Sequence, residues 1–328
     1  MDIKTLALKG LRKTYRHIFN PKFPIHECIL DRNKANEAIY KLLISDKPCM
    51  ISRFGSGEIG IVTNYISIHD NRNIISKSMQ YITDDYGLPW WDKLWFKSMK
   101  NNAGIFPETT DILEKFAERY LEDAPLMDLI GSFNYTEKYM PIKEDIVRVH
   151  LECMYPFWSE RPWTLALQDK KVLVVHPFVE TIKQQYSRRK LLFDDKRILP
   201  EFELICVKAV QSNAGNEVDF KDWFEALKVI EDDISNKEFD YCILGCGAYG
   251  LPLAAFVKRL GKKAIHMGGG SQLLFGIKGK RWDNDGYHWK NLPQLNTNYS
   301  SLYNEYWVRP SKEETPRAAN NVEGACYW

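Results

Sequence analysis

The second half of the chain alternates apolar runs with helical patterns, and this alternation limits the possible folds more than any other feature. Four apolar runs are long enough for strands, at 171–176, 202–207, 241–244 and 264–267. Apolar residues recur at helical spacing between them, at 181–186, 219–234 and 251–260. Runs that are apolar at successive positions are typical of parallel strands buried on both faces. The alternation therefore predicts the α/β class, with a mostly parallel, wound, Rossmann-like sheet and right-handed crossovers.

The rest of the chain extends this organisation at both ends. Residues 30–45 have the spacing of a helix, 48–52 form a short apolar run, and a glycine-bearing turn follows at 53–58. The segment after Lys290 is rich in turn-forming residues. We therefore predict an N-terminal helical segment (1–45), a Rossmann-like domain (46–290) and a C-terminal wrap (291–328).

Charge and composition argue against several classes of protein. Lysine plus arginine total 45 against 43 for aspartate plus glutamate, and this net charge of +2 argues against a nucleic-acid partner. The seven cysteines follow no regular spacing, as expected for free thiols in a reducing compartment. No run of about 18 apolar residues is present, so no membrane-spanning segment is expected. These features favour a cytoplasmic protein.

Residues 1–22 combine basic and apolar residues at roughly helical spacing. Such a helix is able to lie on an anionic lipid surface, which would place the protein at the inner face of the membrane. The simpler interpretation is an ordinary terminal helix that packs on the domain. The sequence leaves both interpretations open.

Unusual residues follow the carboxyl ends of the predicted strands. Arg53-Phe-Gly-Ser-Gly-Glu58 follows the first strand, and His176 ends the second. Gly245-Cys-Gly-Ala-Tyr-Gly250 and His266-Met-Gly-Gly-Gly-Ser-Gln272 follow two later strands. In an open α/β sheet, ligands bind beyond these ends. We therefore expect the four segments to converge on one ligand site.

The segment from Gly245 to Gly250 formally matches the dinucleotide fingerprint Gly-x-Gly-x-x-Gly. The acid that this motif requires at the end of the next strand is missing, because 264–267 reads Ala-Ile-His-Met. A nicotinamide-dependent oxidoreductase therefore remains only an alternative. Glycines and helix N-termini still favour contact with phosphate, although tight turns would explain the same glycines.

A second glycine-rich turn, Gly268 to Gly270, precedes a predicted helix at 271–277. Ser271 is the expected N-cap of this helix. Lys278 and Arg281 follow this helix. Both are candidate partners of a phosphate group, because cations form strong charge-assisted hydrogen bonds with it.

Glu58 is the strongest candidate among the carboxylates. It follows a strand and a glycine turn, where it could bind a divalent metal or act as general base toward an acceptor hydroxyl. The alternative is a charge that stabilises a helix N-terminus. Asp283 and Asp285 form a second candidate metal pair, for which a plain turn is the simpler interpretation. Of the two histidines at strand ends, His266 is a candidate base and His176 a candidate substrate contact.

The motif from Arg53 to Glu58 resembles the Arg-(Tyr/Phe)-Gly-Asp-Gly-Glu signature of the GT-D type bacterial glycosyltransferases. Four further segments are similar to the closing part of GT-D-like proteins: 245–255, 264–282, 305–310 and 322–328. The resemblance covers about residues 45–328. It implies that 46–290 is a Rossmann-like GT-D catalytic domain, which transfers a sugar from a nucleotide donor, commonly a UDP-sugar.

In that family an Asp-x-Glu pair is associated with the metal and the donor diphosphate. This sequence has Ser56 at the aspartate position, so only Glu58 remains. Hard cations favour several charged oxygens. Either Mg²⁺ or Mn²⁺ binds with substrate oxygens completing its shell, or Lys278 and Arg281 neutralise the diphosphate instead.

The motifs and the resemblance together imply a glycosyltransferase that acts on a bacterial surface glycan or lipid-linked acceptor, with no organic cofactor. Glu58 and His266 are the predicted catalytic residues. The predicted substrate contacts are Arg53, Gly55, Ser56, Gly57, His176, Gly245, Gly247, Tyr249, Gly250, Gly268, Gly269, Gly270, Gln272, Lys278, Arg281 and Trp282. A nicotinamide-dependent oxidoreductase and a non-catalytic protein that binds nucleotides or sugars are the alternatives.

Overall fold

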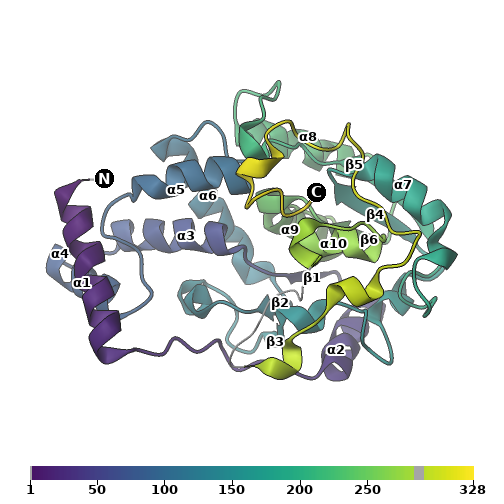
Figure 1. Cartoon of the computed structure of the whole chain (residues 1–328), viewed down its shortest axis with the longest axis horizontal. Helices are drawn as coiled ribbons and strands as arrows, with labels where there is room; N and C mark the ends of the chain where they lie inside the picture. Colours follow the sequence, from purple (N-terminus) through teal and green to yellow (C-terminus); the bar gives the residue numbers. More distant parts are fainter. Residues whose placement is uncertain (1, 284–291) are drawn as a thin grey trace.

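The computed structural model describes residues 2–283 and 292–328, and within these residues one seven-stranded sheet forms the centre of the molecule (Figure 1). Its strands are β1 (Cys49–Ser52), β2 (Leu129–Ser132), β3 (Val147–His150), β4 (Lys171–His176), β5 (Glu203–Lys208), β6 (Tyr241–Leu244) and β7 (Lys263–His266). Neighbouring strands are parallel, in the order β3-β2-β1-β7-β6-β4-β5. The predicted α/β class with a wound parallel sheet is confirmed.

The strands of the second half lie within one residue of the apolar runs that predict them. The sequence does not predict β2 and β3. Each is only four residues long, β2 contains Gly131, and β3 places Val147 on the surface at an edge of the sheet. Short strands with glycine or exposed positions lack the apolar signal that identified the others.

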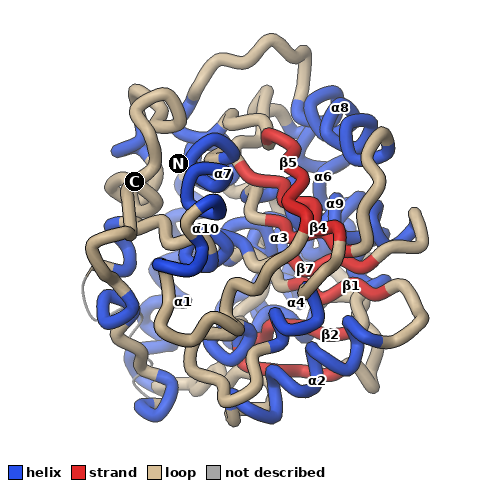
Figure 2. The backbone as a smooth tube through the Cα atoms, turned by 90° about the vertical axis from the view of Figure 1, so that its right-hand side faces the viewer, coloured by secondary structure: helices blue, strands red, loops and turns tan. Residues whose placement is uncertain are grey.

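Helices cover both faces of the sheet, as Figure 2 shows. One face packs against α3 (Ser56–His69), α6 (Thr110–Asp123), α8 (Trp223–Ser235) and α9 (Gly250–Arg259). The other face packs against α2 (Arg32–Ile44), α7 (Val179–Ser187) and α10 (Ser271–Leu274). In β4, Leu173 and Val175 belong to the first core, and Val172 and Val174 belong to the second. Successive side chains of β4 point into opposite cores, so a polar side chain on either face would be buried, and the strand is apolar at successive positions.

The helices α1 (Ile3–Phe19) and α4 (Ile74–Thr83) pack together at one end of the molecule (Figure 1). The short helix α5 (Lys93–Ser98) precedes a π-helical turn, Met99–Ala103. No helix in residues 2–283 and 292–328 is long and apolar enough to cross a membrane.

Two predicted boundaries change next to the sheet. The expected turn at 53–58 is shorter, because α3 begins at Ser56 with Gly55 as its N-cap. The expected helix at 271–277 ends at Leu274, and Gly276 then has a φ of +64°. The prediction of Ser271 as an N-cap is wrong. Its hydroxyl donates to the carbonyl oxygen of Gly268 at 2.7 Å and caps no amide.

Residues 292–328 contribute side chains to the core on the face that carries α2, α7 and α10, and the end of this segment packs against Ala214 (Figure 1). Tyr299 and Trp307 pack into the second core. The Glu314 carboxylate accepts a hydrogen bond from the amide of Glu180 in the first turn of α7, at 2.8 Å. The domain boundaries at 45 and 290 stay predictions, since α2 shares a core with the strands.

Candidate functional site

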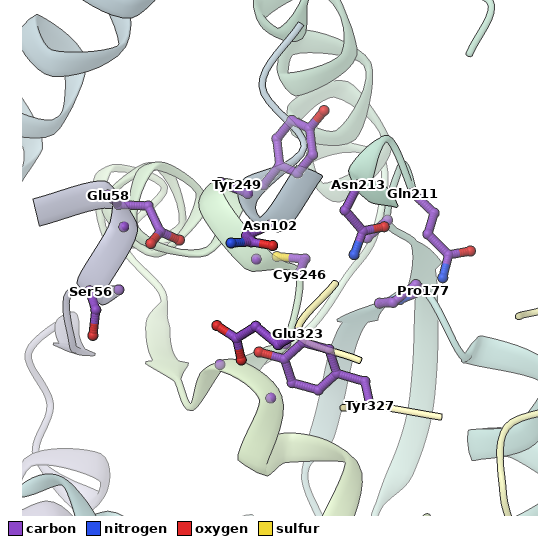
Figure 3. Close-up of a pocket in the computed structure, with 18 of the residues that line it drawn as sticks. Ser56, Glu58, Asn102, Pro177, Gln211, Asn213, Cys246, Tyr249, Glu323 and Tyr327 are labelled. Atoms are coloured by element: carbon purple, nitrogen blue, oxygen red, sulfur yellow. The ribbon is translucent and has the colours of Figure 1, made fainter. Parts of the chain in front are cut away.

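A cavity of about 420 Å³ lies at the carboxyl ends of β1, β4, β6 and β7, where the sequence predicts that four segments converge (Figure 3). Most of the predicted site residues line it: Arg53, Gly55, Ser56, Gly57, Glu58, His176, Gly245, Gly247, Tyr249, His266, Gly268, Gly269, Gln272 and Arg281. One cavity therefore contains both the β1 motif and the glycine bend after β7. Their roles in binding and catalysis stay predictions.

The remaining predicted residues lie outside the wall of this cavity. The Lys278 ammonium lies over the Tyr303 ring, 5.2 Å from its centroid. Trp282 is buried in the second core. A Cβ on Gly250 would lie 2.2 Å from Nε2 of His266, and a Cβ on Gly270 would lie against the Tyr155 ring. These two glycines allow close packing within the protein.

The second candidate metal pair receives no support from the structure. Asp283 forms an ion pair with Arg309 at 2.6 Å. Asp285 lies outside the described residues. The Asp283 carboxylate is therefore engaged by a cation of the C-terminal segment, away from the cavity at the sheet edge.

Arg53 contributes a positive charge to the cavity. One terminal nitrogen of its guanidinium, Nη1, donates to the carbonyl oxygen of Phe54 at 2.9 Å. Its Nε is buried and has no hydrogen-bond partner among residues 2–283 and 292–328. No carboxylate of these residues lies within ion-pair distance of the Arg53 guanidinium. A Cβ on Gly268 would lie 2.5 Å from Arg53 Nη2, so the glycine after β7 leaves room for this side chain. The site thus presents a partly buried cation to an anionic ligand.

Glu58 is the third residue of α3, and its carboxylate points toward the middle of the cavity (Figure 3). It lies over Gly55, where a Cβ would be only 2.0 Å from its Oε2. The N-cap Gly55 provides no side-chain hydrogen bond, and Glu58 is the acidic residue of this first turn. Both predicted roles, a base and a helix-stabilising charge, are compatible with this position.

The two histidines at strand ends are buried and uncharged. Burial lowers the pKa of His176 to about 3, and Nδ1 of this ring accepts a hydrogen bond from the amide of Phe178 at 3.0 Å. Burial, assisted by the charge of Arg53, also lowers the pKa of His266 to about 3. Nδ1 of His266 lies 3.0 Å from the Ser52 hydroxyl. A pKa this low makes His266 a weak proton acceptor, so Glu58 is the better candidate for a base.

Protein atoms occupy much of the space beside the glycine loops. A Cβ on Gly245 would lie 1.8 Å from the Ser271 hydroxyl, and a Cβ on Gly269 would lie 2.3 Å from the Tyr327 ring. These positions are explained by tight packing. Gly247 differs, because it has a φ of +59° and its nearest neighbour would be the Ala103 carbonyl oxygen at 3.9 Å. Of these three glycines, Gly247 leaves backbone open to a ligand.

The side chains of Tyr249 and Gln272 mainly contact other residues of the protein at the cavity wall. The Tyr249 ring stacks on Trp223 at 4.8 Å, and its hydroxyl lies 3.3 Å from that of Ser212. The side-chain amide of Gln272 donates to the carbonyl oxygen of Tyr327 at 3.1 Å. Gln272 therefore fixes the C-terminal segment at the cavity.

No protein-family model matches the chain, and no curated protein matches it. Two solved structures are weakly similar. Both are of the domain of unknown function 1792, one of them with selenomethionine and the other described as having a distinct glycosyltransferase fold. They are 13% identical to this chain, cover 94% of it and 96% of their own length, and give TM-scores of 0.35 and 0.36. A likeness at this level assigns neither a family nor an activity.

Several cavity residues are not among the predicted site residues. Asn102 lies in the π-helical turn, Gln211 and Asn213 follow β5, and Glu323 and Tyr327 come from the C-terminal segment (Figure 3). The Asn213 Oδ1 is buried and has no hydrogen-bond partner in the described parts of the chain. Only the C-terminal pair had a signal in the sequence, because both residues lie in the segment 322–328.

The carboxylates around the cavity do not fit a resident divalent cation. Among the described residues that line it, the acidic side chains are Glu58 and Glu323, and Glu323 forms an ion pair with Arg281. Within residues 2–283 and 292–328, no group of three or more His, Cys, Asp or Glu side chains could hold a metal ion. Because Mg²⁺ and Mn²⁺ favour several charged oxygens, Glu58 with Ser56 beside it is a poor donor set.

Proposed function

We propose that this protein is a glycosyltransferase that moves a sugar from a nucleotide-sugar donor, with a UDP-sugar favoured, to a hydroxyl group of a glycan or lipid-linked acceptor. The observation that carries the proposal is the cavity in which an unpaired Arg53 and the Glu58 carboxylate meet at the carboxyl edge of one parallel sheet. The resemblance of this Arg53–Glu58 motif to the GT-D signature supports the same activity.

The proposed reaction separates binding of the diphosphate from removal of the proton. Arg53 and the open backbone at Gly247 bind the donor diphosphate. Glu58 accepts the proton of the acceptor hydroxyl while the acceptor oxygen bonds to the anomeric carbon. The bond between this carbon and the diphosphate oxygen breaks, and its electron pair leaves with the nucleoside diphosphate. Because the donor set does not fit a resident metal, the chain's own cation carries the charge stabilisation.

Helix α1 supports contact with a membrane surface as part of this function. Its basic face points inward, because Lys9 pairs with Asp92 at 2.5 Å and Arg16 pairs with Asp85 at 2.9 Å. Its apolar side chains are exposed instead, with Ile3 85% accessible. Other exposed apolar residues of this end are Leu6, Leu11, Ile18 and Phe19 of α1 and Ile74, Ile75 and Met79 of α4. An apolar patch with Lys4 and Lys13 exposed beside it suits an anionic lipid surface at the cytoplasmic face.

The donor site is tested by thermal unfolding with UDP, UDP-glucose, UDP-N-acetylglucosamine and NADH. A ligand that binds only the native state raises the unfolding temperature by mass action. We expect the uridine compounds to raise it and NADH to leave it unchanged. Stabilisation by NADH alone would refute the proposed function and favour an oxidoreductase.

The membrane contact is tested by flotation with phosphatidylglycerol vesicles. Leu11 and Ile44 are equally exposed, at 54%, but lie on α1 and α2. We expect Leu11→Glu to reduce flotation and the matched control Ile44→Glu to retain it. Equal flotation of both variants would exclude the α1 face.

A further inference from the structure

A second cavity, of about 520 Å³, lies beside the first one. The two share three lining residues, Ser56, Trp95 and Ser98. The start of α3 separates them: Glu58 lines only the first cavity, and Gly60 lines only the second. The candidate base is therefore two residues along α3 from Gly60, which lines the second, adjoining space.

The Trp95 ring is held at the junction by α3. A Cβ on Gly60 would lie 2.4 Å from Cη2 of this ring, so only glycine lets the indole lie against the helix. Trp95 is partly buried and packs against the first core. A fixed aromatic surface at the junction of two cavities is suited to the apolar face of a sugar ring.

The second cavity contains charges of both signs that neutralise each other. Lys9 pairs with Asp92 at 2.5 Å, and Arg12 pairs with Asp85. Two carboxylates in the wall disfavour a second diphosphate, in contrast to the unpaired Arg53 of the first cavity. Charged side chains that already have partners still accept and donate hydrogen bonds, as hydroxyl-rich ligands require. The buried Nε of Arg12 has no hydrogen-bond partner in residues 2–283 and 292–328.

We propose that this second cavity binds the acceptor as a neutral carbohydrate, stacked on Trp95, with its reacting hydroxyl at the junction beside Ser56 and Glu58. This assignment rests on the proposed function, because it needs a donor in the first cavity. Helix α1 forms part of the wall through Lys9 and Arg12. Helix α1 therefore lies between the acceptor site and the exposed apolar face that we propose to contact lipid.

The experiment measures release of UDP from UDP-glucose and UDP-N-acetylglucosamine, alone and with a panel of p-nitrophenyl glycosides. We expect at least one glycoside to accelerate the release. Trp95→Leu removes the stacking surface, and we expect about a tenfold rise in the glycoside KM. The affinity for UDP, measured by calorimetry, stays within about twofold.

A second variant, in α3, should displace the same Trp95 ring. Gly60→Ala places a methyl group where Trp95 lies, and we expect it to raise the glycoside KM as well. Because both changes act through one ring, the double variant should be no worse than Trp95→Leu alone. The matched control is Trp91→Leu, since Trp91 packs edge-on against Phe96 and lines neither cavity. We expect this control to keep the glycoside KM of the original protein.

The outcomes separate the acceptor site from the proposed function. If UDP binds and is released but no glycoside accelerates the reaction, or if Trp95→Leu keeps its glycoside KM, the acceptor site is wrong and the donor site stands. If neither UDP nor any UDP-sugar binds the original protein, the proposed function itself fails. The active glycoside is also attached to a dodecyl chain and presented in phosphatidylglycerol vesicles, to decide whether the acceptor is a free or a lipid-linked carbohydrate. Faster UDP release with the vesicles than with the free glycoside would indicate a lipid-linked acceptor.

Discussion

Replacing Glu58 by glutamine removes one negative charge and leaves the shape of the side chain almost unchanged. Glu58 is the acidic residue of the first turn of α3, and the Gly55 N-cap adds no side-chain hydrogen bond. A charge at this position stabilises a helix by about 0.3–1 kcal/mol. For a chain of 328 residues, that loss lowers the unfolding temperature by only about 0.4–1.5 °C. The folded protein therefore remains available for an activity measurement.

The effect on transfer should be far larger. A general base contributes about 10²- to 10⁴-fold to the rate, and a glutamine cannot accept the proton. We expect release of UDP in the presence of an acceptor to fall by this factor in Glu58→Gln. The affinity for UDP should change little, because the diphosphate is bound by Arg53.

Glu225 supplies the matched control. It is the third residue of α8, as Glu58 is of α3, and it is exposed. Glu225→Gln should lower the unfolding temperature by a similar amount and leave the rate unchanged. Full activity of Glu58→Gln would remove this carboxylate from the mechanism. A similar loss of activity in both variants would assign the effect to helix stability.

Three further outcomes follow from the site. Arg53→Gln should weaken UDP binding about 10- to 100-fold, because a charge-assisted hydrogen bond contributes about 1.5–3 kcal/mol; calorimetry measures this, and unchanged binding would contradict it. EDTA should leave UDP release unchanged, since one carboxylate does not make a divalent site; a loss restored by Mn²⁺ would show otherwise. Below pH 6.5 the unfolded state takes up protons that His176 and His266, with pKa values of about 3, do not bind when folded. The free energy of unfolding should therefore decrease as the pH is lowered, by about 2 kcal/mol for each histidine between pH 7 and pH 5. Urea unfolding of His266→Gln should show a smaller decrease over this pH range, and an identical decrease would refute this.

The sequence predicts the fold where successive apolar residues identify buried strands. This holds for β4, whose Val172–Val175 core run faces two helical layers. It fails for β2, because Gly131 interrupts a four-residue strand. The convergence of the strand-end motifs is predictable from topology alone, since parallel strands present their carboxyl ends at one edge.

The sequence predicts less well which groups surround a given side chain. The pattern of α1 shows a basic stripe and an apolar stripe, but only Asp85 and Asp92 decide that the basic stripe faces the protein. His266 has the residue type of a base, yet its burial beside Arg53 lowers its pKa. Asn213 lines the cavity from a loop without a motif, so no local signal identifies it. Each of these depends on contacts between distant parts of the chain.

The neighbouring position of β1 and β7 has a consequence for how the site is assembled. Arg53 follows a strand near the start of the chain, and Gly268 follows the last strand, yet the two are adjacent. A ribosome has produced most of the polypeptide before these partners can meet. Nascent or truncated chains that end before β7 therefore lack the pocket altogether, and activity should be acquired in a single late step of folding, after slow pairing of strands remote in sequence.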